Sequence, residues 1–237
     1  MFLWRACSAA LLACLLFFFL DGCGGGKKGK GDVMVLFTSD VHCGVDAGFG
    51  YAGLWQLRKQ LESEGYETIL VDAGDSIQGE PIGTLSRGAA VIELMNAMCY
   101  DVAVPGNHEF DGGDKLLGDI FERMDSEIID TNLDFEHSKA FQNVIDDGKL
   151  LKTKIIEVED DKKDGVKHKV LMLGVSPVNL AYYTKNTPNT SFIDNKDIPQ
   201  KQVTEQDYEA TTQACIDEIN KFKAENPNGA VILFSHT

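Results

Sequence analysis

Short apolar runs alternate with longer segments of helical periodicity over the first half of the chain. Strand-like runs precede or follow each helical segment, and they lie at residues 33–37, 68–71, 102–104 and 127–129. The segments with apolar residues at helical spacing are residues 52–65, 89–100 and 114–124. In the second of them, Val91, Leu94, Met95 and Met98 are expected on the buried face. This alternation predicts an α/β fold.

The pattern changes after residue 150. Two strand-like runs, residues 153–158 and 169–174, are joined by a polar segment that contains Asp164-Gly165, so we expect an antiparallel hairpin. Residues 177–202 are polar and predict a long irregular connection. Residues 204–223 then predict a helix, and residues 230–234 a last strand.

Composition is that of an ordinary globular protein. Of the 237 residues, 43% are hydrophobic and 25% are charged, which is enough for one sizeable core. The net charge of −15 is spread along the chain instead of forming a tail. A polyanion would be repelled, so nucleic acid is not expected as a partner.

The N-terminus has the pattern of an export signal. Arg5 precedes an apolar run at residues 9–20, and Cys23 follows it, succeeded by a stretch rich in glycine and lysine. This order resembles a bacterial lipoprotein signal, with residues 1–22 as signal peptide, Cys23 as the lipidated residue and residues 23–32 as a flexible tether. A plain secretory peptide cut nearby is the alternative. Both interpretations predict an exported protein, periplasmic or on the cell surface.

After such cleavage, the cysteines besides Cys23 are Cys43, Cys99 and Cys215. Three thiols at wide spacing do not form a disulfide framework. Cys99 and Cys215 lie within apolar helical patterns and are expected to be buried.

Metal-ligand side chains follow four of the predicted strands. Asp40 and His42 come after the first, Asp75 after the second, Asn107 and His108 after the third, and His236 after the last. Ligands of α/β sheets bind beyond the carboxyl ends of the strands, where loops converge. Each short motif alone is weak, but four in order predict one site.

The donor types indicate which ions such a site would hold. Mixed oxygen and nitrogen donors suit Mn, Fe, Co or Zn better than calcium. One carboxylate can bridge two such ions, and a bridged pair about 3.5 to 4 Å apart holds a hydroxide for in-line attack at phosphorus. His108 is placed to face a substrate, and Asp111 could fix its tautomer. A structural role for His108, and a simple turn at Asp111, remain the alternatives.

These motifs resemble a known family. Asp40-x-His42, Gly74-Asp75-x-x-x-Gly79, the run from Gly106 to Asp111 (GNHEFD) and Ser235-His236 are similar to the calcineurin-like metallophosphoesterases. The longer strings VDAGDSIQGEPIGT at residues 71–84 and YDVAVPGNHEFD at residues 100–111 resemble the bacterial 5′-nucleotidase branch. That branch also contains UDP-sugar hydrolases and 2′,3′-cyclic phosphodiesterases. The resemblance extends from about residue 33 to the end.

The resemblance implies a four-layer αββα sandwich with two mixed sheets over residues 33–237, and a role for each motif residue. Two divalent metal ions would be held, with Asp75 as the bridge and Asn107 and His236 as ligands of the second ion. Asp40 and His42 would bind the first ion. His108 would be catalytic and Asp111 would hold its ring.

The family also has a Gly-His-x-His motif and a C-terminal nucleoside-binding domain, which are not found in these 237 residues. We therefore expect a catalytic domain that is truncated at its C-terminus. The function implied is an exported, lipid-anchored 5′-nucleotidase that acts on nucleoside monophosphates. A cyclic-nucleotide or nucleotide-sugar hydrolase, and a catalytically inactive exported scaffold, are the alternatives. The nucleoside-binding residues, the identity of the metal ions and the oligomeric state do not follow from the sequence.

Overall fold

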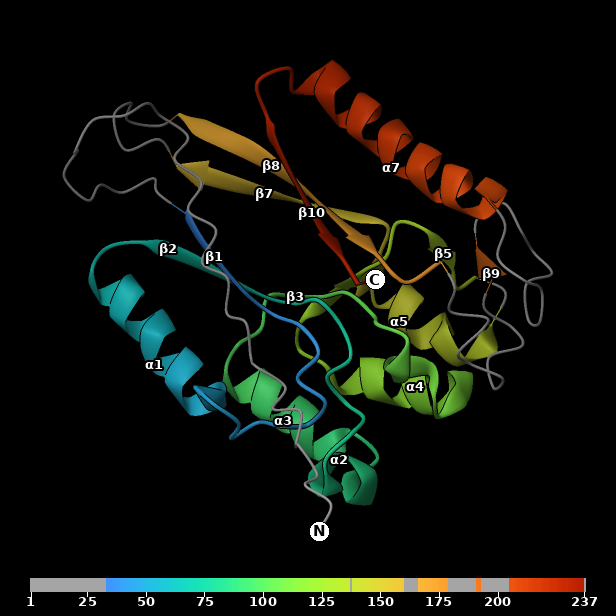
Figure 1. The fold of residues 1–237 in the computed structure, drawn as a ribbon. Helices are drawn as coiled ribbons and strands as arrows, with labels where there is room; N and C mark the ends of the chain where they lie inside the picture. The colour runs from blue at the N-terminus through green and yellow to red at the C-terminus, as the bar shows by residue number, and fades with distance from the viewer. Residues whose placement is uncertain (1–32, 137, 160–165, 179–190, 193–204, 237) are drawn as a thin grey trace, which may run out of the picture.

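A computed structural model describes residues 33–136, 138–159, 166–178, 191–192 and 205–236. The predicted signal peptide, the tether and Cys23 lie outside the described residues. Two sheets form the centre of the molecule (Figure 1). The first is parallel throughout and has the order β1 (Val33–Thr38), β2 (Glu67–Asp72), β3 (Val102–Ala103), β4 (Glu127–Ile129) and β6 (Leu150–Leu151).

The second sheet is mixed. β8 (Lys167–Val175) lies in its middle, parallel to β10 (Ala230–Ser235) and antiparallel to β7 (Thr153–Glu159). A further antiparallel pair joins β5 (Leu133–Asp134) to β9 (Ser191–Phe192). The expected hairpin of β7 and β8 is therefore confirmed. β9 lies within the segment for which we predicted only irregular structure. Its two residues form a strand because they pair with β5, which is distant in the sequence. Sequence periodicity does not predict such a pairing.

Helices cover the outer faces of both sheets. One group follows the strands of the first sheet, namely α1 (Gly50–Ser63), α2 (Pro81–Ser86), α3 (Ala89–Ala97), α4 (Gly113–Arg123) and α5 (Gln142–Asp146), with short 3₁₀ helices η1 (His108–Phe110) and η2 (Lys139–Phe141). α7 (Glu205–Glu225) lies on the far side of the second sheet (Figure 1). This gives the expected four layers in the order helix, sheet, sheet, helix. Two mixed sheets were predicted, but in the part of the chain that the structure describes only the second sheet is mixed, because every pairing in the first is parallel.

Three apolar cores separate these layers. Alternation along each strand sends neighbouring side chains to opposite faces. In β1, Val35 packs between the two sheets while Leu36 packs against the helices of the first sheet. In β8, Met172 faces the first sheet, whereas Leu171 and Leu173 pack under α7. β1 and β8 thus each contribute side chains to two cores, and the core between the sheets packs one sheet against the other.

Two predictions about buried residues were wrong. Leu94 is 38% exposed, and Ile92 takes the buried place beside Val91 and Met95 on α3. Cys99 is exposed because the chain leaves α3 there in a left-handed turn with φ 55°. Cys43 and Cys215 are buried, and all three thiols are free. Among the described residues, no helix is both long and apolar enough to cross a membrane.

Candidate metal centre

The loops after β1, β2, β3 and β10 converge at one edge of the two sheets. They bring together two groups of side chains that could each hold a metal ion. One group is Asp40, Asp75 and His236, and the other is His42, Asp75 and His108. The carboxyl ends of parallel strands share one edge, so residues far apart along the chain become neighbours. Asp75 belongs to both groups.

Distances between the donor atoms fit bound divalent ions. Asp75 Oδ2 lies 3.2 Å from His236 Nε2 and 3.8 Å from His42 Nε2. Asp40 Oδ1 lies 3.9 Å from His236 Nε2 and 4.0 Å from His42 Nε2. Two ligands that each bind one ion at about 2.1 Å are separated by at most about 4.2 Å. All four separations are within this limit, so the residues present fit metal binding.

The backbone at this edge is held in an unusual conformation. Asp40, His42 and Asp75 have positive φ angles of 55°, 47° and 58°. Residues other than glycine adopt this region rarely, and such strain is concentrated at functional sites. Backbone hydrogen bonds from Asp40 N to Gly74 O (2.9 Å) and from His42 N to Asp75 O (2.8 Å) hold the two loops in place. The strain is therefore supported by the surrounding structure.

Gly74 allows the loops to approach each other closely. Its φ is 97°, and a Cβ there would lie 2.5 Å from the backbone nitrogen of Gly106 and 2.9 Å from His236 Nδ1. A side chain would therefore displace the loop that carries Asn107 and His108. The requirement is steric as well as conformational.

Carbonyl groups orient the two candidate histidine ligands. His236 Nδ1 lies 2.8 Å from Ala73 O, and His42 Nδ1 lies 3.1 Å from Gln78 O. A proton on Nδ1 that is donated to a carbonyl leaves Nε2 free to bind an ion, which is the usual arrangement of metal-binding histidines.

Electrostatics at the centre favour positive charge. Burial lowers the pKa of His236, but its hydrogen bond with Asp75 and the nearby Asp40 carboxylate outweigh burial and raise the pKa to about 9. Burial raises the pKa of Asp75, but hydrogen bonds from His236 and from the backbone of His108 outweigh it, so that pKa is lowered. The carboxylates of Asp75 and Asp40 that hold a proton on His236 would also attract a metal cation, so the proton and the cation compete for His236.

His108 lies beside the candidate ligands. Its Nδ1 is 2.7 Å from Asp111 Oδ2, its ring centroid is 5.2 Å from that of His42, and its backbone N–H donates to Asp75 Oδ1 (2.8 Å). Asp111 therefore contacts the ring of His108 at Nδ1, as a residue that fixes the tautomer of this histidine must. Burial lowers the pKa of His108, but Asp111 and the charge of Asp75 outweigh this effect and raise it. His108 lies close enough to His42 and Asp75 to bind the same ion. The geometry is therefore compatible with His108 as a metal ligand and with His108 as a catalytic residue.

The remaining predicted ligand, Asn107, directly precedes His108 at the start of η1 and is partly buried. The structure therefore brings every motif residue that it describes to one sheet edge. Of the histidines outside the motifs, His168 is exposed on β8, and His137 lies outside the described residues.

Sequence reasoning missed Glu109. Its carboxylate is buried (7% exposed) and accepts four backbone N–H groups. Oε2 accepts from Asp75 N (2.7 Å) and Gly106 N (2.7 Å), and Oε1 accepts from Ser76 N (2.8 Å) and Ile77 N (3.3 Å). Glu109 therefore ties the loop of Asp75 to the loop of His108. A glutamate inside a glycine-rich loop was the only signal in the sequence.

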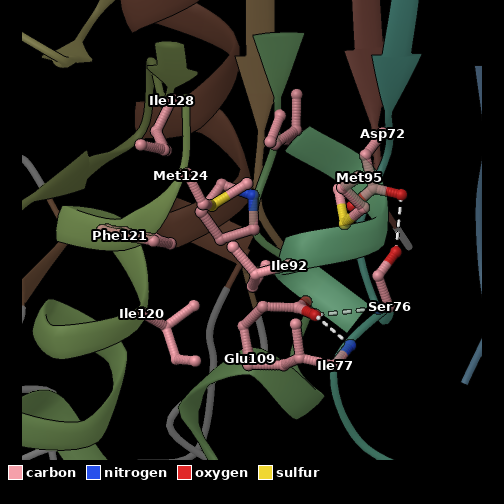
Figure 2. A pocket seen from close by; sticks show the side chains of 13 residues that line it. Asp72, Ser76, Ile77, Ile92, Met95, Glu109, Ile120, Phe121, Met124 and Ile128 are labelled. Carbon is pink, nitrogen blue, oxygen red and sulfur yellow. Dashed lines mark hydrogen bonds between the residues drawn. The ribbon is translucent and has the colours of Figure 1, made fainter. Parts of the chain in front are cut away.

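A second buried carboxyl group lies close to Glu109. Asp72, Ser76 and Glu109 line one cavity together with apolar side chains from α3 and α4 (Figure 2). Burial and the charge of Glu109 raise the pKa of Asp72 to about 7. Hydroxyl groups of Thr38 (2.9 Å) and Ser76 (2.6 Å) donate to it. Asp72 is thus paired with polar partners despite its burial.

Comparison with known proteins identifies one family. The sequence matches the family described as calcineurin-like phosphoesterase over residues 33–237. It is 26% identical over 225 residues to the trifunctional nucleotide phosphoesterase protein YfkN of Bacillus subtilis (strain 168), covering 89% of this chain and 15% of that protein. It is 27% identical over 220 residues to the 5′-nucleotidase of Homo sapiens, covering 86% of this chain and 34% of that protein.

Solved structures agree on the fold. The crystal structure of a 5′-nucleotidase precursor from Thermus thermophilus superposes with a TM-score of 0.64 at 20% identity. The match covers 85% of this chain and 36% of that one. The chain therefore spans only about a third or less of the length of these relatives.

Glu109→Gln should weaken both the fold and the metal centre. Each carboxylate oxygen of Glu109 accepts two backbone N–H groups. In glutamine, an NH₂ group would replace one of these oxygens and would point at N–H groups that it cannot accept from. We expect a loss of about 2 to 4 kcal/mol in the free energy of unfolding, measured by urea denaturation. Glu122→Gln, on the exposed face of α4, is the control and should change little. Equal stability of the two variants would contradict this account of Glu109.

Metal binding should release a proton near neutral pH. With its pKa at about 9, His236 is protonated below that pH, and an ion must displace this proton. Affinity for Mn²⁺ should therefore fall by about tenfold for each unit that the pH decreases below about 9. Calorimetric titration in buffers of different ionisation enthalpy counts the protons released. His236→Gln should bind more weakly and release fewer protons; an unchanged count would show that another group supplies the proton.

Proposed function

The chain belongs to the calcineurin-like phosphoesterase family, and from this premise we propose that it hydrolyses nucleoside 5′-monophosphates at a pair of divalent metal ions. The observation that carries the proposal is the position of Asp75. Its carboxylate is shared by two groups of potential ligands. A single carboxylate between two ligand groups is suited to joining a pair of ions.

In this proposal, Asp40 and His42 bind the first ion, Asn107 and His236 bind the second, and Asp75 joins them. His42 Nε2 lies 3.8 Å from Asp75 Oδ2 and 4.0 Å from Asp40 Oδ1, and His236 Nε2 lies 3.2 Å from Asp75 Oδ2, which is compatible with this assignment. Asp40 Oδ1 is also 3.9 Å from His236 Nε2, so the same geometry would allow Asp40 and His236 to share an ion. Two such ions would neutralise phosphate oxygens and lower the pKa of water, which makes a nucleophile available at neutral pH.

His108 delivers the proton that the leaving group needs. The P–O bond to the ribose oxygen breaks, and that oxygen must gain a proton to leave as an alcohol. Asp111 Oδ2 accepts a hydrogen bond from the protonated Nδ1 of His108, which leaves Nε2 to act on the substrate. The contacts that raise the pKa of His108 favour the protonated form that this step uses.

The names of two relatives support a nucleotide as the substrate. One is a 5′-nucleotidase and another is a trifunctional nucleotide phosphoesterase. A relative from Haemophilus influenzae is named 2′,3′-cyclic-nucleotide 2′-phosphodiesterase/3′-nucleotidase, which supports cyclic nucleotides as alternative substrates. Nucleotide sugars are a further alternative, since the same metal centre could attack any phosphoester placed beside it.

The purified protein, with residues 33–237 and whatever residues adjoin them in the natural protein, should release phosphate from AMP when supplied with Mn²⁺, and a chelator should stop the reaction. AMP, 2′,3′-cyclic AMP and a UDP-sugar are compared by measuring the phosphate or nucleotide released. Asp75→Asn should lose bound metal, because it removes the shared ligand. His108→Ala should keep the metal and lose about 10²- to 10⁴-fold in turnover.

His168→Ala, which alters an exposed histidine on β8, is the matched control and should retain activity. Loss of metal from His108→Ala to the extent seen with Asp75→Asn would make His108 a ligand instead. Absence of hydrolysis of all three substrates by the metal-loaded protein would reject the proposed function.

We further propose that the protein is exported and anchored to a membrane through Cys23. The apolar run before this cysteine and the glycine-lysine stretch after it support the proposal. A labelled fatty acid should enter the wild-type protein and not Cys23→Ser, measured by gel autoradiography of expressing cells. Cys43→Ser is the control, since Cys43 is buried in the fold. Equal labelling of Cys23→Ser and the wild type would exclude this anchor.

A further inference from the structure

A buried polar junction joins the two sheets at the edge that carries the metal centre. Asp130 follows β4 of the first sheet, and Ser176 follows β8 of the second. Asp130, Ser176 and Asn132 are 2%, 0% and 1% exposed. Polar side chains this deeply buried must be paired, because an unpaired one destabilises the fold.

Asn132 fixes the backbone of Ser176. Its amide Nδ2 donates to Ser176 O (3.0 Å), and its Oδ1 accepts from Ser176 N (2.9 Å). Asp130 Oδ1 in turn accepts from the backbone N–H groups of Asn132 (3.1 Å) and Leu133 (2.8 Å). The ends of β4 and β8 are therefore held in a single relative position.

The contacts of the Ser176 hydroxyl determine where the protons lie. Ser176 Oγ is 2.6 Å from Pro105 O and 2.6 Å from Asp130 Oδ2. The hydroxyl has one proton, and a carbonyl oxygen can only accept, so Ser176 donates to Pro105. The equally short contact with Asp130 then needs a proton from the carboxyl group. Both contacts are satisfied only when Asp130 is a neutral acid that donates to Ser176.

This chain of hydrogen bonds ends at two parts of the metal centre. Pro105 leads directly into Gly106, Asn107 and His108. Val175, the neighbour of Ser176, accepts a backbone hydrogen bond from His236 N (3.0 Å). Ser176 is thus the point at which the loop of His108 and the strand end of His236 are held relative to each other.

We propose that neutral Asp130 and Ser176 are positioning residues, which set the Asn107–His108 loop against His236 so that the ligands of the two sheets meet. The role in hydrolysis rests on the proposed function. The role in metal binding and in stability does not.

The surroundings of Asp130 favour the neutral form. Burial raises its pKa to about 7. The titratable groups around it are Cys215 on α7, which it influences electrostatically, and Lys152, Asp134 and Glu136, which line the same cavity as Asp130. The hydrogen bonds with Ser176, Leu133 and Asn132 lower the pKa of Asp130, but burial outweighs them.

Replacing Asp130 by asparagine, which is neutral and has the same shape, distinguishes this proposal from the alternative that the fold needs a negative charge at this position. Asparagine at position 130 can accept the two backbone N–H groups through its oxygen and donate to Ser176 through its amide. Asp130→Asn should therefore bind Mn²⁺ within about twofold of wild type, whereas Asp130→Ala and Ser176→Ala should lose about tenfold. Mn²⁺ titration followed by electron paramagnetic resonance measures this directly. Glu109→Gln is the contrasting control, because there the charge is needed.

The pH dependence gives a second readout. The folded-state pKa of Asp130 is above its unfolded value of about 4, so the folded protein holds the extra proton between about pH 4 and pH 7. Stability from this group is lost as the pH rises through that range. The melting temperature of Asp130→Asn should rise relative to wild type from about pH 5 to pH 7 and stay constant relative to it above about pH 8.

Three results would overturn the proposal. They are failure of Asp130→Asn to fold, metal binding by Asp130→Asn as weak as that of Asp130→Ala, and a melting-temperature difference that does not change between about pH 5 and pH 8. AMP hydrolysis is measured on the same samples. If the melting-temperature difference does not depend on pH while the wild type hydrolyses AMP, the proposal for Asp130 and Ser176 is refuted and the proposed function is not. If the metal binding and pH dependence are as expected but the wild type does not hydrolyse AMP, only the proposed function is refuted.

Discussion

The carboxylate of Glu109 is the constraint on which the metal centre depends. It accepts backbone N–H groups from the loop of Asp75 and from the loop of His108. Asp75 has a positive φ, a conformation that residues other than glycine adopt rarely and that its surroundings stabilise. By binding both loops at once, Glu109 holds Asp75 Oδ1 against His108 N and Asp75 Oδ2 toward the histidines on either side. The bridging position of Asp75 is a consequence of this buried charge.

Two buried acids near the site are held in opposite protonation states by their partners. Burial raises the pKa of both Glu109 and Asp130. Glu109 is surrounded only by donors, so its charged form is the one that the structure satisfies. Asp130 faces a hydroxyl group already committed to Pro105, so its neutral form is satisfied. Partner identity, more than depth of burial, decides the charge of a buried carboxyl group.

Sequence periodicity predicted the strands and helices that carry the site, because each has its own apolar pattern and the ligands follow strand ends. It did not predict Glu109, Ser176 or Asp130 as structural partners. Their contacts join residues up to 71 positions apart, and no local pattern records such pairs. The same limit explains β9, which exists only through its pairing with β5. Cys99 was assigned to a buried face by its apolar neighbours, but a left-handed turn directs it to solvent.

Most of the candidate ligands follow strands of the first sheet, and one follows a strand of the second. Metal binding therefore depends on how the two sheets are aligned. Asp40, His42, Asp75 and Asn107 follow strands of the first sheet, whereas His236 follows β10 of the second. His236 Nε2 must reach within 3.2 Å of Asp75 Oδ2 across the core between the sheets. A shift of about 1 Å between the sheets would exceed the tolerance of a metal site, which is a few tenths of an ångström. Apolar packing alone is non-directional and cannot set this distance. The directional hydrogen bonds of Ser176 and Asn132 at the end of β8 supply the alignment that the shared core cannot.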